Sequence, residues 1–168
     1  MEWLEGGAGD DTLYGNRDAD VLAGGPGDDD LYGRDAADRE NGGPGDDLLT
    51  GGAGGAAPDV LRGGAGDDVL FSAPGNDRLY GGPDDDVLYG EEGDDRADGG
   101  AGNDVLAGGE DRDVLTGGAG NDRLFGETEA DDLDGGPGSD LLDGGRSIND
   151  CQAGEVLFHC RHRQAPPS

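Results

Sequence analysis

The chain has 168 residues, 38 of them glycine, and its 40 acidic residues against 11 basic ones give a net charge of −29. Nucleic acid is not expected as a partner, since phosphate binding needs a basic surface and only Arg161-His162-Arg163 is basic. No apolar run approaches the ~18 residues that span a bilayer, and residues 1–4 lack the features of a signal peptide. Membrane insertion is therefore not expected, while secretion stays open.

Residues 1–5 are predicted to be a partial repeat or an N-terminal cap. Glu2-Trp3-Leu4-Glu5 fit the last four positions of the nine-residue unit that follows, with Glu2 in the place of an aspartate. Solenoids carry a polar cap over the terminal rung, because an uncovered edge invites further pairing. Either Trp3 folds over as a makeshift cap, or an upstream part belongs to the protein; the capping argument favours the second interpretation.

From Gly6 to Asp143 the chain repeats a unit that at its best reads G-G-x-G-x-D-x-L-x, and the frame slips once, by three residues, between Gly51 and Arg62. Leucine holds the eighth position in thirteen of the fifteen units, the exceptions being Glu40 and Ala97. A period this strict indicates a solenoid, in which each turn and strand can bury its apolar side chain only against its neighbours. Aspartate holds the sixth position in every unit: Asp11, Asp20, Asp29, Asp38, Asp47, Asp59, Asp68, Asp77, Asp86, Asp95, Asp104, Asp113, Asp122, Asp131 and Asp140.

Each unit predicts a tight turn followed by a short strand. Glycines at positions one, two and four permit positive φ angles, and the last three residues have strand character. Two units complete an eighteen-residue coil, and coils stack at the strand spacing of about 4.8 Å, which places aspartates of like turns above one another. Such carboxylates repel, whereas a calcium ion between like turns accepts both carboxylate and backbone carbonyl oxygens. Magnesium fits less well, because it demands a tighter octahedron.

The unit at residues 99–107, Gly-Gly-Ala-Gly-Asn-Asp-Val-Leu-Ala, resembles the repeat of the RTX, or haemolysin-type, calcium-binding proteins. The resemblance implies an all-β, right-handed parallel β-roll, a β-solenoid of about seven or eight coils over residues 6–143. It also implies a secreted, extracellular protein that folds on meeting calcium and could be the C-terminal part of a larger one. A flexible Gly/Asp-rich segment is the alternative, but linkers do not keep leucine in register.

Alternate units differ in quality. The first, third and later odd-numbered units keep their glycines, whereas even-numbered units lose them, as in Gly33-Arg34-Asp35-Ala36. A side chain at the second and fourth positions should close off the positive φ angles that aim carbonyls at an ion. We therefore expect about seven calcium ions between the eight odd turns, with Asp84 weakening the sites that use its turn. A weaker even-edge site is expected at Asp77 and Asp95.

The predicted metal-binding residues of the odd turns are the following: Gly7, Gly9, Asp11, Gly25, Gly27, Asp29, Gly43, Gly45, Asp47, Gly64, Gly66, Asp68, Gly82, Asp86, Gly100, Gly102, Asp104, Gly118, Gly120, Asp122, Gly136, Gly138 and Asp140.

Residues 144–160 are predicted to be a degraded repeat and a cap, and residues 161–168 a mobile tail. Cys151 and Cys160 suit a disulfide in an oxidising compartment, a feature similar to the Cys-containing tail of some secreted RTX-repeat proteins. Free thiols are one alternative. Another is a zinc site made of Cys151, His159, Cys160 and His162.

We do not expect an enzyme. The carboxylate pairs repeat identically, whereas catalysis needs one asymmetric site, and neither H-E-x-x-H nor G-x-S-x-G occurs. The sequence thus predicts a calcium-binding structural module. The alternative is adhesion, ligand binding or self-association through the apolar outer face of the odd strands, where Val69, Phe71, Val87 and Tyr89 are expected to form a ladder.

Overall fold

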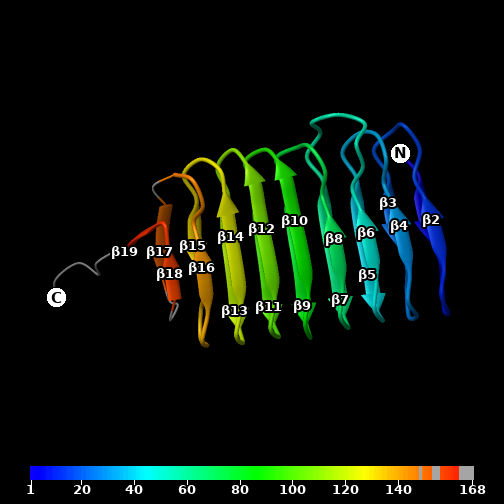
Figure 1. Cartoon of the computed structure of the whole chain (residues 1–168). Helices are drawn as coiled ribbons and strands as arrows, with labels where there is room; N and C mark the ends of the chain where they lie inside the picture. The colour runs from blue at the N-terminus through cyan, green and yellow to red at the C-terminus, as the bar shows by residue number, and fades with distance from the viewer. Residues whose placement is uncertain (148, 153–155, 163–168) are drawn as a thin grey trace, which may run out of the picture.

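The computed structural model describes residues 1–147, 149–152 and 156–162, with backbone only at 156, 157 and 160–162. These residues form no helix. They make two parallel sheets that face each other in a β-solenoid of about eight turns of about 18 residues (Figure 1). Among them no helix is long and apolar enough to cross a membrane. The predicted all-β parallel solenoid is confirmed.

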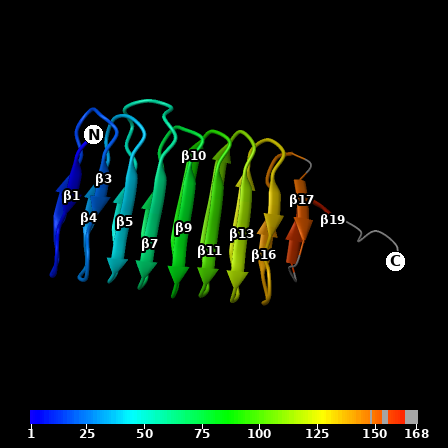
Figure 2. The same cartoon turned by 180° about the vertical axis from the view of Figure 1, so that it is seen from behind.

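The ten strands of one sheet, here sheet A, face the viewer in Figure 2. In order they are β1 (Trp3–Glu5), β3 (Val21–Ala23), β5 (Arg39–Pro44), β7 (Val60–Ala65), β9 (Arg78–Pro83), β11 (Arg96–Ala101), β13 (Val114–Ala119), β15 (Asp132–Asp134), β17 (Asn149–Gln152) and β19 (Cys160–His162). Sheet B has nine strands. They are β2 (Thr12–Tyr14), β4 (Asp30–Tyr32), β6 (Leu48–Thr50), β8 (Val69–Phe71), β10 (Val87–Glu92), β12 (Val105–Glu110), β14 (Arg123–Glu127), β16 (Leu141–Asp143) and β18 (Val156–Phe158).

Strand register confirms the eighteen-residue coil. Trp3 pairs with Val21, and the same offset recurs up to β17 in sheet A and β16 in sheet B except at the predicted slip, where Arg39 pairs with Val60 and Leu48 with Val69. The last coil is shorter, since Leu141 pairs with Val156 and Asn149 with Cys160. The three additional residues lie in the connection from β6 to β7, which forms the tall loop at the top of Figure 1. The odd turns lead from sheet A to sheet B, and the even turns lead back.

The core is a double row of leucines from the eighth position, nearly all with no exposed surface. Glu40 and Ala97, the two exceptions, are buried in the same row. Seven strands are twice as long as the three residues predicted and run on into the turn glycines. They do so because the glycine backbones pair across coils, as Gly100 does with Gly118.

The chain ends differ from a simple cap. Trp3 is 68% exposed, lies on the outer face of sheet A beside Val21 and Arg39, and donates its indole N–H to Glu5. At the other end the coil pattern continues, since Cys151 pairs with Leu133 and takes its place in the core.

The end of the chain was predicted to be a tail from residue 161. Arg161 and His162 lie in β19, while residues 163–168 lie outside the described part of the chain. The side chain of Cys160 also lies outside it, so the disulfide, with its thiol and zinc alternatives, stays a prediction.

Candidate metal centre

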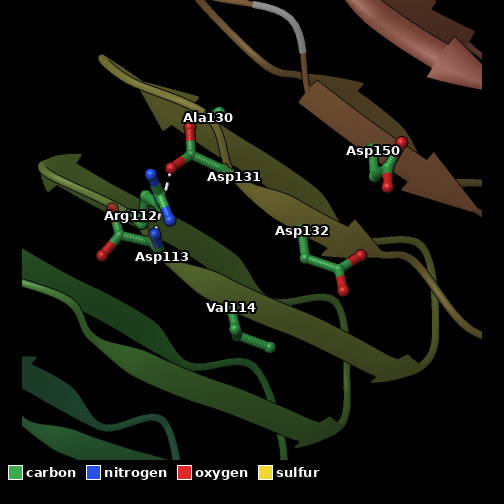
Figure 3. Close-up of a pocket in the computed structure, with 7 residues that line it drawn as sticks. All are labelled: Arg112, Asp113, Val114, Ala130, Asp131, Asp132 and Asp150. Atoms are coloured by element: carbon green, nitrogen blue, oxygen red, sulfur yellow. Dashed lines mark hydrogen bonds between the residues drawn. The ribbon is translucent and has the colours of Figure 1, made fainter.

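The sixth-position aspartates form two internal columns, one along the odd turns and one along the even turns. Nearly all are buried. From Asp20 onward one oxygen of each carboxylate, Oδ1, accepts the backbone N–H of the equivalent residue one coil earlier. Asp86 donates to Asp104 at 2.9 Å, and Asp104 to Asp122 at 2.9 Å. Figure 3 shows the same bond in the even column, from Asp113 to Asp131. The columns predicted from the coil period are therefore present.

The second oxygen of these carboxylates is buried without a partner. This holds for most of both columns in the described chain: Asp29, Asp38, Asp47, Asp68, Asp77, Asp86, Asp95, Asp104, Asp113, Asp122, Asp131 and Asp140 all have an unpaired Oδ2. A buried, unpaired carboxylate oxygen is costly, because it has lost its water and gained nothing. So regular a set of unpaired, buried acceptors fits the binding of a cation or a proton.

The first glycine of each turn makes room for this oxygen. A Cβ placed on Gly99 would lie 2.4 Å from Asp104 Oδ2 and 2.7 Å from the carbonyl oxygen of Gly117 in the next coil. Both acceptors therefore lie beside the α-carbon of Gly99. The same pair recurs at Gly81 and at Gly90, with the carbonyls of Gly99 and Gly108. A carboxylate and a carbonyl oxygen are the ligand types that calcium prefers.

Burial also raises the pKa of these carboxyl groups. It brings the pKa of Asp68, Asp86 and Asp113 to about 7 and that of Asp95 to about 8, although the backbone hydrogen bond to each opposes the shift. Neighbouring carboxylates of the same column raise the pKa further, because like charges disfavour ionisation. A bound cation would remove both penalties.

Backbone oxygens must complete any such site. In the described chain no three acidic, histidine or cysteine side chains lie close enough together to hold a metal. The predicted odd-turn glycines at the second and fourth positions have positive φ, as expected, except Gly138. Asp84, which replaces a glycine there, also has a positive φ, of 81°. The odd turns thus share one backbone shape from which carbonyl ligands can be drawn.

The expectation that the even turns would lose this shape is wrong. Non-glycine residues adopt positive φ in them, each at a cost of about 1–2 kcal/mol. The ladders and the buried leucines on both sides impose the turn despite this cost. The residues are Arg34, Ala36, Ala73, Glu91, Asp111, Glu127 and Glu129.

One even turn does depart from the pattern. No residue of the turn 15–20 has a positive φ, and the N–H of Asn16 donates to Asp20 Oδ2 at 2.9 Å. Asp20 therefore has the donor that the other carboxylates lack. This turn offers a natural contrast to the odd column.

A second, outer ladder on the odd edge was not predicted. The fifth-position side chain of each odd turn accepts the N–H of its equivalent in the next coil, from Asp10, which accepts from Asp28 at 3.2 Å, to Asn121, which accepts from Ser139 at 3.1 Å. On the even edge, within the described residues, this bond links only Asn76, Asp94 and Arg112. The sequence carries the signal, because the fifth residue of every odd unit but the last is aspartate or asparagine.

Asn149 shows how the protein satisfies this position without a charge. It takes the sixth position of the last even turn, is fully buried, and accepts the N–H of Asp131 at 2.8 Å. Its Nδ2 occupies the place of the unpaired Oδ2 and donates to the carbonyls of Gly144 and of Ser147, the latter at 3.0 Å. Where the side chain brings its own donor, the acceptors are satisfied.

Figure 3 also shows an open hollow of about 410 Å³ on the even edge, beside sheet A. Arg112 lies on one side of it, and Asp132 and Asp150 project from neighbouring strands on the other. Asp113 and Asp131 of the even column also line the hollow.

A solenoid whose repeated turns carry a column of buried carboxylates beside backbone carbonyls belongs to the class of metal-binding repeat proteins. A family model for the RTX calcium-binding nonapeptide repeat (4 copies) matches residues 2–31, 32–55, 53–79, 72–106, 80–115, 98–131, 107–142 and 116–149. The chain belongs to this family, and its repeats are calcium-binding repeats. No curated protein sequence matches it.

Proposed function

We propose that the chain is a non-catalytic structural module that is secreted and folds when it binds extracellular calcium. About seven ions lie between consecutive odd turns, held by the sixth-position aspartates and by backbone carbonyls of the turn glycines. The observation that carries the proposal is the column of buried, unpaired Oδ2 atoms, each beside a carbonyl oxygen. When bound, calcium neutralises the column and joins successive coils.

The odd edge is favoured by its continuous outer ladder and its intact glycines. The even edge shares the unpaired oxygens, and we retain the weaker site at Asp77 and Asp95. The outer ladder of the even edge passes through these two turns, and Ser72 donates to the carbonyl of Gly90 at 2.7 Å, which ties the turns together.

Calcium removal tests the proposal. At neutral pH, circular dichroism should change from β-rich to disordered when a chelator is added, and a calcium titration should restore the β signal steeply, since each ion orders a turn used by the next site. An unchanged spectrum and hydrodynamic radius after chelation would overturn the proposal.

Two matched variants test the position of the ions. Asp104→Ala removes a carboxylate shared by two neighbouring odd sites. The calcium concentration at which half of the protein is folded should therefore rise several-fold. Asp20→Ala removes a carboxylate that already has Asn16 as a donor, so calcium binding should change little. Equal effects of the two substitutions would contradict the assignment to the odd column.

A second candidate function is binding through the outer face of sheet B. One observation favours it: Phe71 and Tyr89 stack with ring centroids 4.9 Å apart and planes within 5°, as the predicted ladder requires. With Val69 and Val87 they form a half-buried apolar patch in the middle of the rod. A second copy of the chain is the occupant we propose, and the test is given below.

A further inference from the structure

Four of the 11 basic residues lie together on the outer face of sheet A, although they are spread over residues 39–96 of the sequence. The strands β5, β7, β9 and β11 are neighbours in the middle of the rod (Figure 2), and each of them places one arginine outward. These residues are Arg39, Arg62, Arg78 and Arg96, and all four are exposed. Since neighbouring strands are about 4.8 Å apart, the four form a line of positive charge about 14 Å long, here called the arginine line.

The arginine line does not serve the fold through ion pairs. Within the described residues none of its four members forms a salt bridge, in a chain with 40 acidic residues. Arg78 and Arg96 are direct partners in the strand register, where like charges destabilise a sheet. Arg62 lies over the ring of Tyr80, 5.0 Å from its centre. At the seventh and ninth repeat positions of these four strands Asp98 is the only acid, so the line is available to an anionic partner.

The surroundings of the arginine line limit the shape of that partner. Exposed acidic residues flank it on both edges of the solenoid: Asp46, Asp67 and Asp85 on the odd edge, and Glu91 and Asp94 on the even edge. A lipid bilayer or a nucleic-acid duplex is wide enough to meet these acids together with the arginines, and charge repulsion would oppose the contact. A single narrow chain that lies along the rod meets chiefly the arginines.

Exposed aromatic rings on the same face indicate the chemistry of the partner. Trp3 and Tyr80 are both exposed. An open hollow of about 290 Å³ lies at the N-terminal end of the line, and its lining includes Trp3, Val21, Arg39 and Arg62. Aromatic faces beside guanidinium groups suit a sugar that carries an anionic group, because the apolar face of the sugar ring packs on the aromatic ring while the guanidinium pairs with the anion.

We propose that the outer face of sheet A binds a linear acidic polysaccharide, whose carboxylate or sulfate groups pair with successive members of the arginine line. A stiff chain of repeated units matches the repeat of one arginine per strand. It also loses less conformational entropy on binding than a flexible acidic peptide does. The inference needs only the folded solenoid, so it goes beyond the proposed calcium function.

Isothermal titration calorimetry of the calcium-loaded chain tests this binding. Low-molecular-weight dextran sulfate is the sulfated probe, oligogalacturonate is the carboxylated probe, and dextran is the neutral control. At least one anionic probe should bind, and more weakly as the sodium chloride concentration rises, whereas dextran should not bind. The difference between the two anionic probes shows which anionic group the face prefers.

Paired substitutions test the position of the site. Arg78→Gln with Arg96→Gln should raise the Kd about tenfold, because two charge-assisted pairs are lost, and Arg39→Gln with Arg62→Gln should have the same effect. The matched control is Arg17→Gln with Arg123→Gln, which makes the same change in net charge outside the line and should bind like the parent. Circular dichroism over a calcium titration should give the parent's result for all three, which separates a lost contact from a lost fold.

Weaker binding by both arginine-line variants, with parent-like binding by the control, supports the site. The inference is overturned if neither anionic probe binds the folded chain, or if the control loses as much affinity as the arginine-line variants. Binding of a single-stranded oligonucleotide as tight as that of the sugars would show attraction to charge alone and would also overturn it. So would self-association of the parent that only the arginine-line variants lose, since a second copy would then be the occupant. If the chain folds without calcium, the proposed function fails, and the same titrations still decide this inference.

Discussion

A sixth-position aspartate serves two neighbouring coils at once. Its N–H donates to the carboxylate of the following coil, while its own carboxylate accepts from the preceding one, as Asp104 does between Asp86 and Asp122. Only one oxygen is satisfied in this way. Oδ1 therefore links successive coils, whereas Oδ2 has no protein partner and is available to a ligand.

Asparagine at this position should keep the oxygen that accepts the N–H of the preceding coil and should place an amide N–H₂ group where the aspartate has Oδ2. Asn149 shows that an amide can supply the missing donor. We predict that Asp104→Asn, like Asp104→Ala, weakens calcium binding, but that at saturating calcium it is more stable than Asp104→Ala by about 1–3 kcal/mol, the cost of leaving buried partners unpaired. Denaturant unfolding of both variants measures the difference. Equal stability would show that the amide forms no bonds there.

The strands were predictable from the sequence, whereas the shape of half of the turns was not. The coil length, the leucine row and the aspartate columns follow from the period, because side chains alternate along a strand. The shape of the even turns did not follow, since local preference disfavours positive φ at Arg34 or Glu127, yet tertiary packing imposes it. The unpaired Oδ2 atoms depend on coordinates that no spacing reveals.

The apolar outer face of sheet B can be tested by removing its stacked aromatic rings. Phe71→Ser with Tyr89→Ser removes one stacked pair, and each cross-strand contact contributes only about 0.2–1 kcal/mol, so calcium-induced folding should persist. We predict that this double variant loses the concentration-dependent association of the parent, measured by analytical ultracentrifugation. Tyr14→Ser with Tyr32→Ser removes the other stacked pair and is the control, expected to associate like the parent. A strictly monomeric parent at high concentration would leave the ladder as a purely structural feature.

At the scale of the whole molecule, the raised carboxyl pKa values predict a pH-dependent fold in the absence of calcium. The folded-state pKa is about 6 for Asp104, about 7 for Asp86 and about 8 for Asp95, against an ordinary value of 3.8. A raised pKa means that the folded chain binds protons more readily than the unfolded chain. The resulting stability is fully present below about pH 4 and is lost as the pH rises through 6 to 8.

Calcium-stripped protein in metal-free buffer should therefore have more β structure at pH 5 than at pH 8, by circular dichroism. With saturating calcium at pH 8 the β signal should return, because the ion takes the place of the protons. Identical calcium-free spectra at both pH values would contradict the role given to the buried carboxyl groups.

The two edges of the solenoid also differ in how they resist mechanical load. On the odd edge each turn is tied to its neighbours by an inner bond in one direction and an outer bond in the other, from Asp10 to Ser139. On the even edge, in the part of the chain that the structure describes, the outer bonds link only three turns, and a longer loop interrupts the stack at 51–59. Bending that opens the even edge therefore breaks fewer hydrogen bonds than bending that opens the odd edge, so the rod should be more compliant on its even side.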